Sequence, residues 1–419
     1  MLRYDIIPTM NGIGNGAIRA VVLGAGYRGR AYAAFANEHP DQLEIVGVAD
    51  PEQAKTIPAP HYWSDWRECL AARPDADVVF ITLPDALHHE AALVALESGY
   101  HLLLEKPIAR TEAQCREIIS KAREKGLLVI TGHVLRYTRY FAHIKAILDS
   151  GELGEVVSIA HQESVGFFKI AHSHCRGNWS NSVRASPIIL QKCSHDFDLF
   201  CWWLGKRCRR VTSFGSIKVF RPENRPNGAA DRCINCPKEI EGACIWSAKK
   251  MYLEYGSQLG YMFADTSRAA MEHVVRETPY GRCVYACDND VPDHQVVNME
   301  FDGGTTVCLV MAGYTERNVR TTRISCTNGE IVGDGDSLHI CRFDGSSVSD
   351  GTAPFSLRVD NPSRHGGGDF NLVAELLRLL RNGSEDDIRN VTEQSLESHL
   401  IAFAAEESRI AGGKVVELK

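Results

Sequence analysis

Two patterns of apolar residues divide the chain near residue 136. Before that point, short apolar runs alternate with stretches whose apolar residues recur at helical spacing. Repeated strand–helix–strand units predict a parallel, doubly wound sheet with right-handed crossovers, which is an α/β domain. The predicted strands are Ile18–Gly24, Leu43–Asp50, Val78–Leu83, His101–Glu105 and Leu127–Thr131, and the predicted helices are Arg28–Asn37, Asp65–Ala72, His88–Ser98 and Thr111–Lys125.

After residue 136, apolar and polar residues alternate with a period of two. Such alternation, with Gly and Asn between the runs, predicts a large, mainly antiparallel open sheet in an α+β domain. The alternating runs are Val156–Gln162, Val211–Phe220, His294–Phe301, Thr305–Met311 and Thr322–Cys326, and the flanking helical patterns are Phe141–Ser150, Asp369–Arg381 and Glu393–Ala411.

The length of the chain agrees with two domains. Its 419 residues exceed what a single hydrophobic core usually serves. We predict a leader over residues 1–17, a nucleotide-binding domain over 18–135 and a substrate and oligomerisation domain over 136–419. Residues 221–293, rich in Pro, Gly, Cys and charge, are too long for an ordinary connection and are predicted to be an ordered insertion.

Composition narrows the possible partners and the location. The formal charge of −7 argues against a nucleic-acid or anionic-membrane partner. No window reaches the roughly 18 uninterrupted apolar residues of a spanning helix, and the amino end lacks the apolar run of a secretory signal. These features predict a cytoplasmic protein without a membrane segment.

A glycine motif follows the first predicted strand and opens a helix. Gly24, Gly26 and Gly29 form G-x-G-x-x-G, in which the glycines permit a tight turn, close approach of a pyrophosphate and close helix–strand packing. Asp50, at the end of the next strand, could accept hydrogen bonds from a ribose diol and would repel a 2′-phosphate, which favours NAD. Arg28, beside Tyr27 inside the motif, leaves NADP open, and a glycine turn with Asp50 as a helix cap is the alternative.

Three further segments carry a resemblance to a known family. They are Thr82-Leu83-Pro84-Asp85-Ala86-Leu87-His88, Glu105-Lys106-Pro107 and Ser194-His195-Asp196-Phe197-Asp198. Together with the glycine motif, and with Arg136-Tyr137 and Gly151-x-x-Gly154, they resemble the Gfo/Idh/MocA oxidoreductases. The resemblance implies a Rossmann domain that binds NAD, an open antiparallel sheet and a sugar or cyclitol substrate. It adds Leu83, Pro84, His88, Glu105 and Lys106 to the expected cofactor contacts, although His88 could simply cap its helix.

The resemblance also implies catalytic roles. Lys106, after a parallel strand, would hold and polarise the reacting hydroxyl, and His195 would transfer its proton, since imidazole titrates near neutral pH. Asp198, three residues on, would lie on the same helix face and matches the family's H-x-x-D aspartate, and both Asp198 and Gln191 are expected to contact the substrate. Gln191 stands where many relatives carry an aspartate and cannot ionise, which leaves the proton route open. The structural alternatives are that Lys106 is a surface lysine in a salt bridge and that His195 is a buried core histidine.

A polar stretch around residues 172–179 is predicted to face the substrate. His174, Arg176 and Trp179 offer hydrogen bonds and an aromatic face to a polyol, and the alternation of His172, His174 and Arg176 would place these three on one face of a strand. The alternative is a solvated loop.

The insertion carries a group of cysteines. Cys233 and Cys236 form C-x-x-C, with Cys244 and Cys287 further along, a pattern in which four thiolates could hold a structural zinc ion. Free thiols and disulfides remain the alternatives.

A homodimer or homotetramer is predicted because an open sheet would leave one face in water. Val307, Leu309 and Met311 alternate along one predicted strand and would line that face.

Three functions are compatible with the sequence. The first is an NAD-dependent oxidoreductase that acts on a secondary hydroxyl of a sugar, cyclitol or sugar derivative. The second is an NAD-dependent glycosidase that works by transient oxidation, elimination and re-reduction. The third, a non-catalytic NAD sensor, is disfavoured by the presence of both Lys106 and His195.

Overall fold

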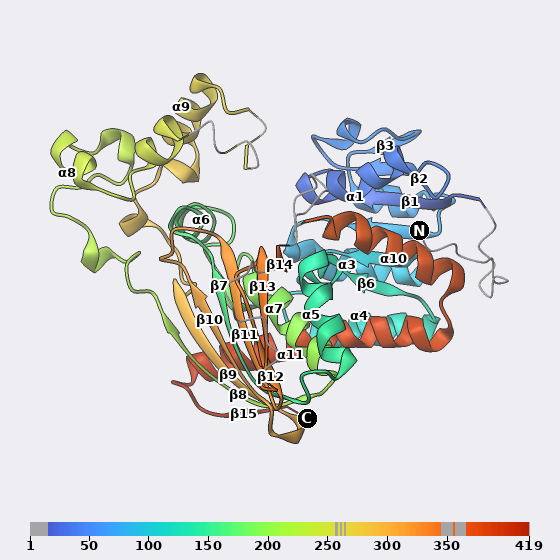
Figure 1. The fold of residues 1–419 in the computed structure, drawn as a ribbon. Helices are drawn as coiled ribbons and strands as arrows, with labels where there is room; N and C mark the ends of the chain where they lie inside the picture. Colours follow the sequence, from blue (N-terminus) through green and yellow to red (C-terminus); the bar gives the residue numbers. More distant parts are fainter. Residues whose placement is uncertain are drawn as a thin grey trace.

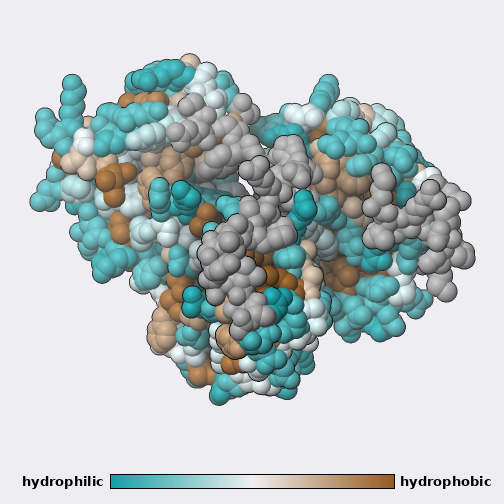
Figure 2. All heavy atoms as spheres, in the orientation of Figure 1, coloured by the Kyte–Doolittle hydropathy of each residue, from teal (hydrophilic) through white to brown (hydrophobic). Residues whose placement is uncertain are grey.

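The computed structural model describes residues 16–255, 259, 262–263, 265–344, 355–356 and 366–418. The predicted leader, residues 1–17, lies almost wholly outside the described residues. The described chain forms a parallel-sheet lobe and an antiparallel-sheet lobe, and the helices of the insertion stand at the far end of the second lobe (Figure 1). On the face seen in Figure 2, the coloured surface of both lobes is mainly hydrophilic with scattered apolar patches.

The first lobe contains a six-stranded parallel sheet of order β3-β2-β1-β4-β5-β6, which confirms the predicted doubly wound fold. Strand β3, only three residues long, is the one that the pattern did not predict. The strands are β1 (Ile18–Leu23), β2 (Leu43–Ala49), β3 (His61–Trp63), β4 (Val78–Ile81), β5 (His101–Leu104) and β6 (Val129–Thr131), and the helices between them are α1 (Tyr27–Glu38), α2 (Trp66–Ala71), α3 (Asp85–Glu97) and α4 (Glu112–Lys125).

Helix α10 (Gly368–Asn382) comes from the carboxyl-terminal part of the chain but packs into the first lobe (Figure 1). Its buried residues Leu372, Val373 and Leu376 share one apolar cluster with Ile18 of β1 and Phe80 of β4. One face of the parallel sheet is therefore covered by a helix that lies beyond residue 135, where the sequence pattern changes.

The second lobe contains a nine-stranded sheet of order β14-β13-β12-β11-β7-β10-β9-β8-β15. Every pairing is antiparallel except that of β7 with β10, so the predicted mainly antiparallel open sheet is confirmed. The strands are β7 (Val156–Ser164), β8 (Cys208–Ser216), β9 (His294–Phe301), β10 (Thr306–Ala312), β11 (Val319–Cys326), β12 (Gly329–Gly333), β13 (Ser337–Arg342), β14 (Phe355–Ser356) and β15 (Val416–Glu417).

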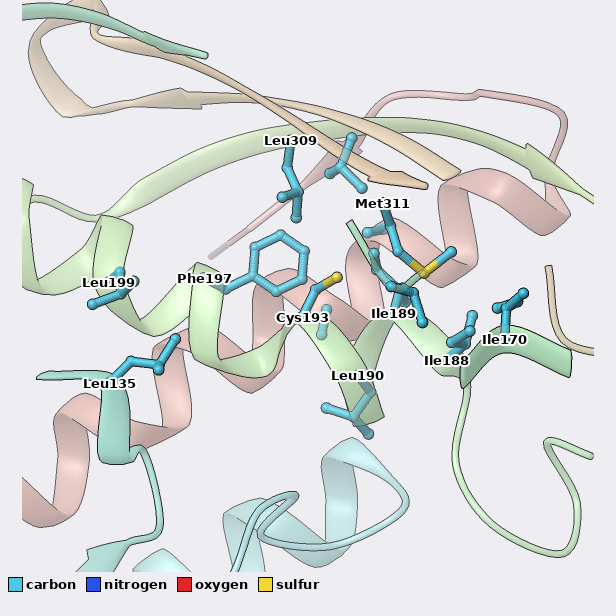
Figure 3. Packing of buried hydrophobic residues seen from close by; sticks show 14 of the residues in the cluster. Leu135, Ile170, Ile188, Ile189, Leu190, Cys193, Phe197, Leu199, Leu309 and Met311 are labelled. Carbon is cyan, nitrogen blue, oxygen red and sulfur yellow. The ribbon is translucent and has the colours of Figure 1, made fainter. Parts of the chain in front are cut away.

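Helix α7 (Ile188–Leu204) covers one face of this sheet. Leu309 and Met311 of β10 point at Cys193 and Phe197 of α7 (Figure 3), and all four side chains are buried. The prediction that Val307, Leu309 and Met311 line an open face is therefore wrong, because these residues lie on the face that α7 covers. The residues that alternate with them, such as Thr306 and Cys308, lie on the other side of the strand.

Three other helices complete the framework. Helix α5 (Arg139–Ser150) leads into the second sheet, and the long helix α11 (Glu385–Ile410) contacts α4, α7 and β8, which joins the lobes. Helix α6 (Phe167–Ala171) follows β7. In the described part of the chain, no helix is both long and apolar enough to span a membrane.

The segment His172–Arg176 is helical, so the expectation of a strand there is wrong. Arg176 points into the insertion, where Nε donates to the Arg282 carbonyl oxygen at 2.7 Å and Nη2 to that of Trp246 at 2.5 Å. The ring of His172 stacks on Tyr280 with centroids 4.4 Å apart. The insertion, which includes the short helices α8 (Lys238–Ala243) and α9 (Arg268–Glu277), is therefore held to the sheet domain by these polar residues.

Candidate active site at the carboxyl edge of the parallel sheet

The glycine motif forms a tight turn between β1 and α1. Gly24 has φ = +94°, and a Cβ there would lie 2.6 Å from the Thr82 carbonyl oxygen. A Cβ at Gly29 would lie 2.1 Å from the Gly24 carbonyl oxygen, whereas one at Gly26 would meet nothing within 4 Å. Helix α1 begins after Gly26 without a side-chain cap, so its first N–H groups and open space suit a pyrophosphate, and the residues present fit a dinucleotide.

Asp50 directly follows β2 and reaches the glycine turn. Its Oδ2 accepts a hydrogen bond from the Ala25 N–H at 2.9 Å, and its Oδ1 accepts from the N–H groups of Glu52 and Gln53. The carboxylate therefore organises two turns beside the predicted ribose position. Oδ2, which accepts one hydrogen bond, retains a lone-pair direction for a further donor, whereas Oδ1 already accepts two.

Arg28 points away from the turn into a buried cluster. Its guanidinium lies 2.7 Å from Glu105 Oε1 and 2.9 Å from Asp369 Oδ1, and Nη2 donates to the Tyr32 hydroxyl oxygen. Although burial opposes ionisation, Arg28 and then Lys106 lower the pKa of Glu105 to about 2. Two carboxylates thus hold Arg28, and Asp369 ties α10 to this site.

His88 joins two turns at the same edge. Its ring nitrogens lie 2.8 Å from the Leu83 carbonyl oxygen and 2.7 Å from that of Pro107, and the side chain is buried. Pro84 precedes α3 as its N-cap without a side-chain cap bond. The turn after β4 and the turn that carries Lys106 are therefore held in a fixed relation.

Lys106 reaches across to α7. Its Nζ donates to the Gln191 carbonyl oxygen at 2.9 Å, and burial lowers the pKa of the ammonium. His195 lies one helical turn after Gln191, so both are on one face of α7. The structure therefore brings Lys106 to α7 one helical turn before His195, with the main-chain oxygen of Gln191 as its partner.

Asp198 contacts two side chains inside the protein, the guanidinium of Arg136 and the imidazole ring of His133. Arg136 Nε and Nη2 lie 2.5 and 2.7 Å from its two oxygens, and His133 Nδ1 lies 2.9 Å from Oδ1. Although burial opposes ionisation, Arg136 and His133 lower the pKa of Asp198 well below its usual range. These contacts occupy the carboxylate that the sequence assigns to the substrate.

Three histidines, His133, His195 and His399, lie close together. The ring centroid of His133 is 5.8 Å from that of His195 and 5.5 Å from that of His399. The Ile108 N–H donates to Nε2 of His399 at 2.9 Å, which leaves the proton on Nδ1, 2.8 Å from the Ser395 carbonyl oxygen. Sequence reasoning missed His133 and His399, because neither lies in a recognisable motif.

The remaining predicted substrate residues separate into two groups. His174 and Trp179 stay together, with ring centroids 6.4 Å apart, and Trp179 is partly exposed whereas His174 is buried. Arg176 uses its guanidinium on the insertion, as described above. Sequence reasoning also missed Lys169 on α6 and Lys192 on α7, because isolated lysines carry no signal in one sequence.

The insertion cysteines do not form a metal centre. Among the residues that the structure describes, no group of three or more His, Cys, Asp or Glu side chains is arranged to hold a metal ion. Cys233 Sγ lies 3.9 Å from the Arg176 guanidinium, and Cys287 Sγ donates to the Cys283 carbonyl oxygen. The predicted zinc site of Cys233, Cys236, Cys244 and Cys287 therefore has no support, and all of these thiols are free.

Comparison with known proteins extends the likeness to most of the chain. A family model described as an oxidoreductase family with an NAD-binding Rossmann fold matches residues 18–133, and the oxidoreductase-family C-terminal alpha/beta domain matches residues 145–409. The 2,7-anhydro-N-acetylneuraminate hydratase of Escherichia coli K12 is 26% identical over 196 residues, which cover 46% of this chain and 51% of the relative. The chain spans about half the length of the curated relatives that it matches.

Solved structures share the fold across both lobes. An NAD-binding oxidoreductase from Klebsiella pneumoniae has a TM-score of 0.70 at 19% identity, and levoglucosan dehydrogenase in complex with NADH and levoglucosan has 0.68 at 18%. Each comparison covers 96% of this chain and 99% of the other. Together with the two matching domain models, these findings show that the chain belongs to the Gfo/Idh/MocA oxidoreductase family.

Proposed function

We propose that this protein is an NAD-dependent oxidoreductase that acts on a secondary hydroxyl of a sugar, cyclitol or sugar derivative. The observation that carries the proposal is the position of Lys106 beside the first turns of α7, where its Nζ is 2.9 Å from the Gln191 carbonyl oxygen. This position lies at the carboxyl edge of the parallel sheet, the same edge that carries the glycine turn, where open α/β sheets bind their ligands.

The proposed chemistry uses two protein groups. Lys106 donates a hydrogen bond to the reacting hydroxyl, and its burial brings the ammonium closer to neutrality, so that it can exchange a proton. His195, on the same side of α7, passes that proton on. The hydride acceptor is the nicotinamide of NAD.

The test is turnover by alanine variants. Lys106→Ala and His195→Ala should each lower kcat on a substrate of the wild type by about 10²–10⁴-fold while NAD still binds. Gln191→Asp, which restores the residue that many relatives carry, should keep activity. Near-normal turnover by His195→Ala would make His195 a structural residue and would end this mechanism.

NAD rather than NADP is the proposed cofactor. Asp50→Ala removes both the charge and the bonds to the glycine turn, whereas Asp50→Asn keeps an acceptor there. Tryptophan fluorescence titrations should show that Asp50→Ala weakens NAD more than NADP. Asp50→Asn should shift the preference toward NADP with a smaller loss of affinity for NAD. Tighter binding of NADP by the wild type would contradict the assignment.

A redox-neutral reaction is the second candidate. A hydratase, by its name, causes no net oxidation, and two of the relatives are so named. In that case NADH formed early would be consumed later, as in the glycosidase alternative. Stoichiometric NAD should then support many turnovers without accumulation of NADH, whereas a dehydrogenase accumulates one NADH per product.

The proposed assembly is a homodimer or homotetramer through the sheet face opposite α7. A groove of about 630 Å³ crosses that face between Arg210, Thr212, Asn298, Glu300 and Cys308. Light scattering at micromolar concentration should report more than one chain per particle. A monomeric mass would contradict this proposal.

A further inference from the structure

Lys106 belongs to a cationic cluster whose other members are Lys169 on α6, Lys192 on α7 and Arg320 on β11. The charges of Lys106, Lys192 and Arg320 all act on Lys169. Lys106 Nζ donates to the carbonyl oxygen of Gln191. Gln191 directly precedes Lys192, so this bond links Lys106 to the part of α7 that carries Lys192. Glu163 lies near the end of β7, six residues before Lys169, and its carboxylate is 2.5 Å from Lys192 Nζ.

The carboxylates of this cluster are already shared. Glu163, which is fully buried, contacts both Lys192 and the Arg320 Nη2, the latter at 3.0 Å. Arg320 Nε lies 2.6 Å from Asp196, whose other partner is His161. Within the described part of the chain, neither a hydrogen bond nor an ion pair is made by the Lys169 ammonium, so no direct partner balances its charge.

The crowding of positive charge changes the pKa values of Lys169 and His174. Repulsion from Lys192, together with burial, lowers the pKa of Lys169 to about 7, with Lys106 and Arg320 acting in the same direction and Glu163 against them. Burial and then Lys192 and Lys169 lower the pKa of His174, so its ring is neutral. Its buried Nδ1 has no hydrogen-bond partner among the described residues and could accept from a ligand hydroxyl.

We propose that this cluster is an anion subsite for the substrate, with Lys169 and Lys192 binding a carboxylate while His174 accepts a neighbouring hydroxyl. The inference rests on the proposed function and adds its substrate class, a sugar acid. A carboxylate suits the subsite better than a phosphate, because the two cations proposed to bind it are lysines, of which Lys192 also contacts Glu163, and the one guanidinium of the cluster, Arg320, is already engaged by Glu163 and Asp196.

Binding should be coupled to a proton. A bound carboxylate stabilises the Lys169 ammonium and raises its pKa, so a neutral Lys169 takes up a proton when the anion binds. Above pH 7 in the free protein, uptake should approach one proton per ligand, and affinity should fall as pH rises. Below pH 6 the ammonium is already present, so uptake should vanish. The charged groups that face Lys169 are Lys192, Glu163, Lys106 and Arg320.

Calorimetry on the NAD-loaded protein tests this without turnover. The probes are matched pairs of acid and neutral derivative: glucuronate with glucuronamide, galacturonate with galacturonamide, and N-acetylneuraminate with its methyl ester. At least one acid should bind about tenfold tighter than its partner, a difference of about 1.4 kcal/mol. At pH 8, buffers of different ionisation enthalpy should reveal proton uptake, which should disappear at pH 6.

Variants locate the effect. Lys169→Met should abolish both the acid preference and the proton uptake, and Lys169→Gln should do the same. Lys121→Gln, which removes an equal charge from the surface of α4, should retain both. Acids that bind no better than their neutral partners, proton uptake that persists in Lys169→Met, or glucose 6-phosphate that binds tighter than every acid would each overturn the proposal.

The outcome is separable from that of the proposed function. If acids bind with proton uptake but no hydroxyl is oxidised, the subsite stands and the oxidoreductase proposal fails. If neutral sugars are oxidised and no acid is preferred, the oxidoreductase proposal stands and the subsite fails.

Discussion

Two groups of buried charge lie along α7, and they differ in how completely they are paired. Asp198 faces Arg136 and His133, and Asp196 faces Arg320 and His161, at distances of 2.5–3.0 Å. The group around Lys106 and Lys169 instead contains ammonium groups that no carboxylate neutralises one for one. Charge that is paired inside a protein joins its elements, whereas unpaired charge implies a partner from outside.

The difference follows from the energetics of burial. Taking a charge out of water costs several kcal/mol in a real protein and is offset only by good hydrogen-bond geometry with an opposite charge. The bidentate contact of Arg136 with Asp198 meets that requirement. Lys169 does not meet it, so the folded protein retains a cost that a bound anion would relieve.

The largest expected effect is on the paired group. Asp198→Ala leaves Arg136 and His133 without their carboxylate and should lower the free energy of unfolding by about 3–5 kcal/mol, as removal of one buried partner does. Urea unfolding followed by circular dichroism measures this change. Asp198→Asn, which keeps an acceptor, should lose less. A loss below about 1 kcal/mol for the alanine variant would mean that Asp198 is not a structural residue.

A smaller loss is expected where Arg176 holds the insertion. Arg176→Met leaves the carbonyl oxygens of Arg282 and Trp246 without these donors, and each unsatisfied buried group costs about 1–3 kcal/mol. Hydrogen exchange should become faster in residues 221–293 while the parallel sheet stays protected. If the exchange rates of the insertion do not change, Arg176 would be free to serve the substrate.

Removal of the unpaired Lys169 charge should stabilise the protein, whereas removal of a paired charge destabilises it. The pKa of Lys169 is about 7 in the folded protein and 10.5 ordinarily, so the folded state binds fewer protons between these values and the protein gains stability as pH rises from 7 toward 10.5. Lys169→Met should therefore raise the free energy of unfolding of the ligand-free protein at pH 6, where the ammonium is present in both the folded and the unfolded state. Thermal unfolding at pH 6 and 9 should show this gain shrink with pH.

The smallest effect is expected at an exposed charge. Lys121 of α4 pairs with Glu97 and Glu124 at the surface, and such pairs contribute about 0–1 kcal/mol. Lys121→Gln should therefore change the thermal midpoint little at either pH. A pH-dependent gain as large as that of Lys169→Met would mean that the loss of any lysine, rather than of the buried one, produces it.

Sequence by itself determined the parts of the molecule that depend on short stretches of backbone. The glycine turn needs a positive φ at Gly24 and no Cβ at Gly29, and the alternation of apolar residues specifies which strands have one buried face. For that reason the parallel sheet, the antiparallel sheet and the position of Lys106 after β5 were predicted correctly.

Only the tertiary structure decided which polar residues face one another. Arg176 looks like a substrate residue until two carbonyl groups of the insertion, 70 and 106 residues further on, accept hydrogen bonds from its guanidinium. Lys169 and Lys192 look like ordinary surface lysines until α6 and α7 bring them to Lys106. Pairing between charges depends on contacts between distant segments, and no local pattern in the sequence records those contacts.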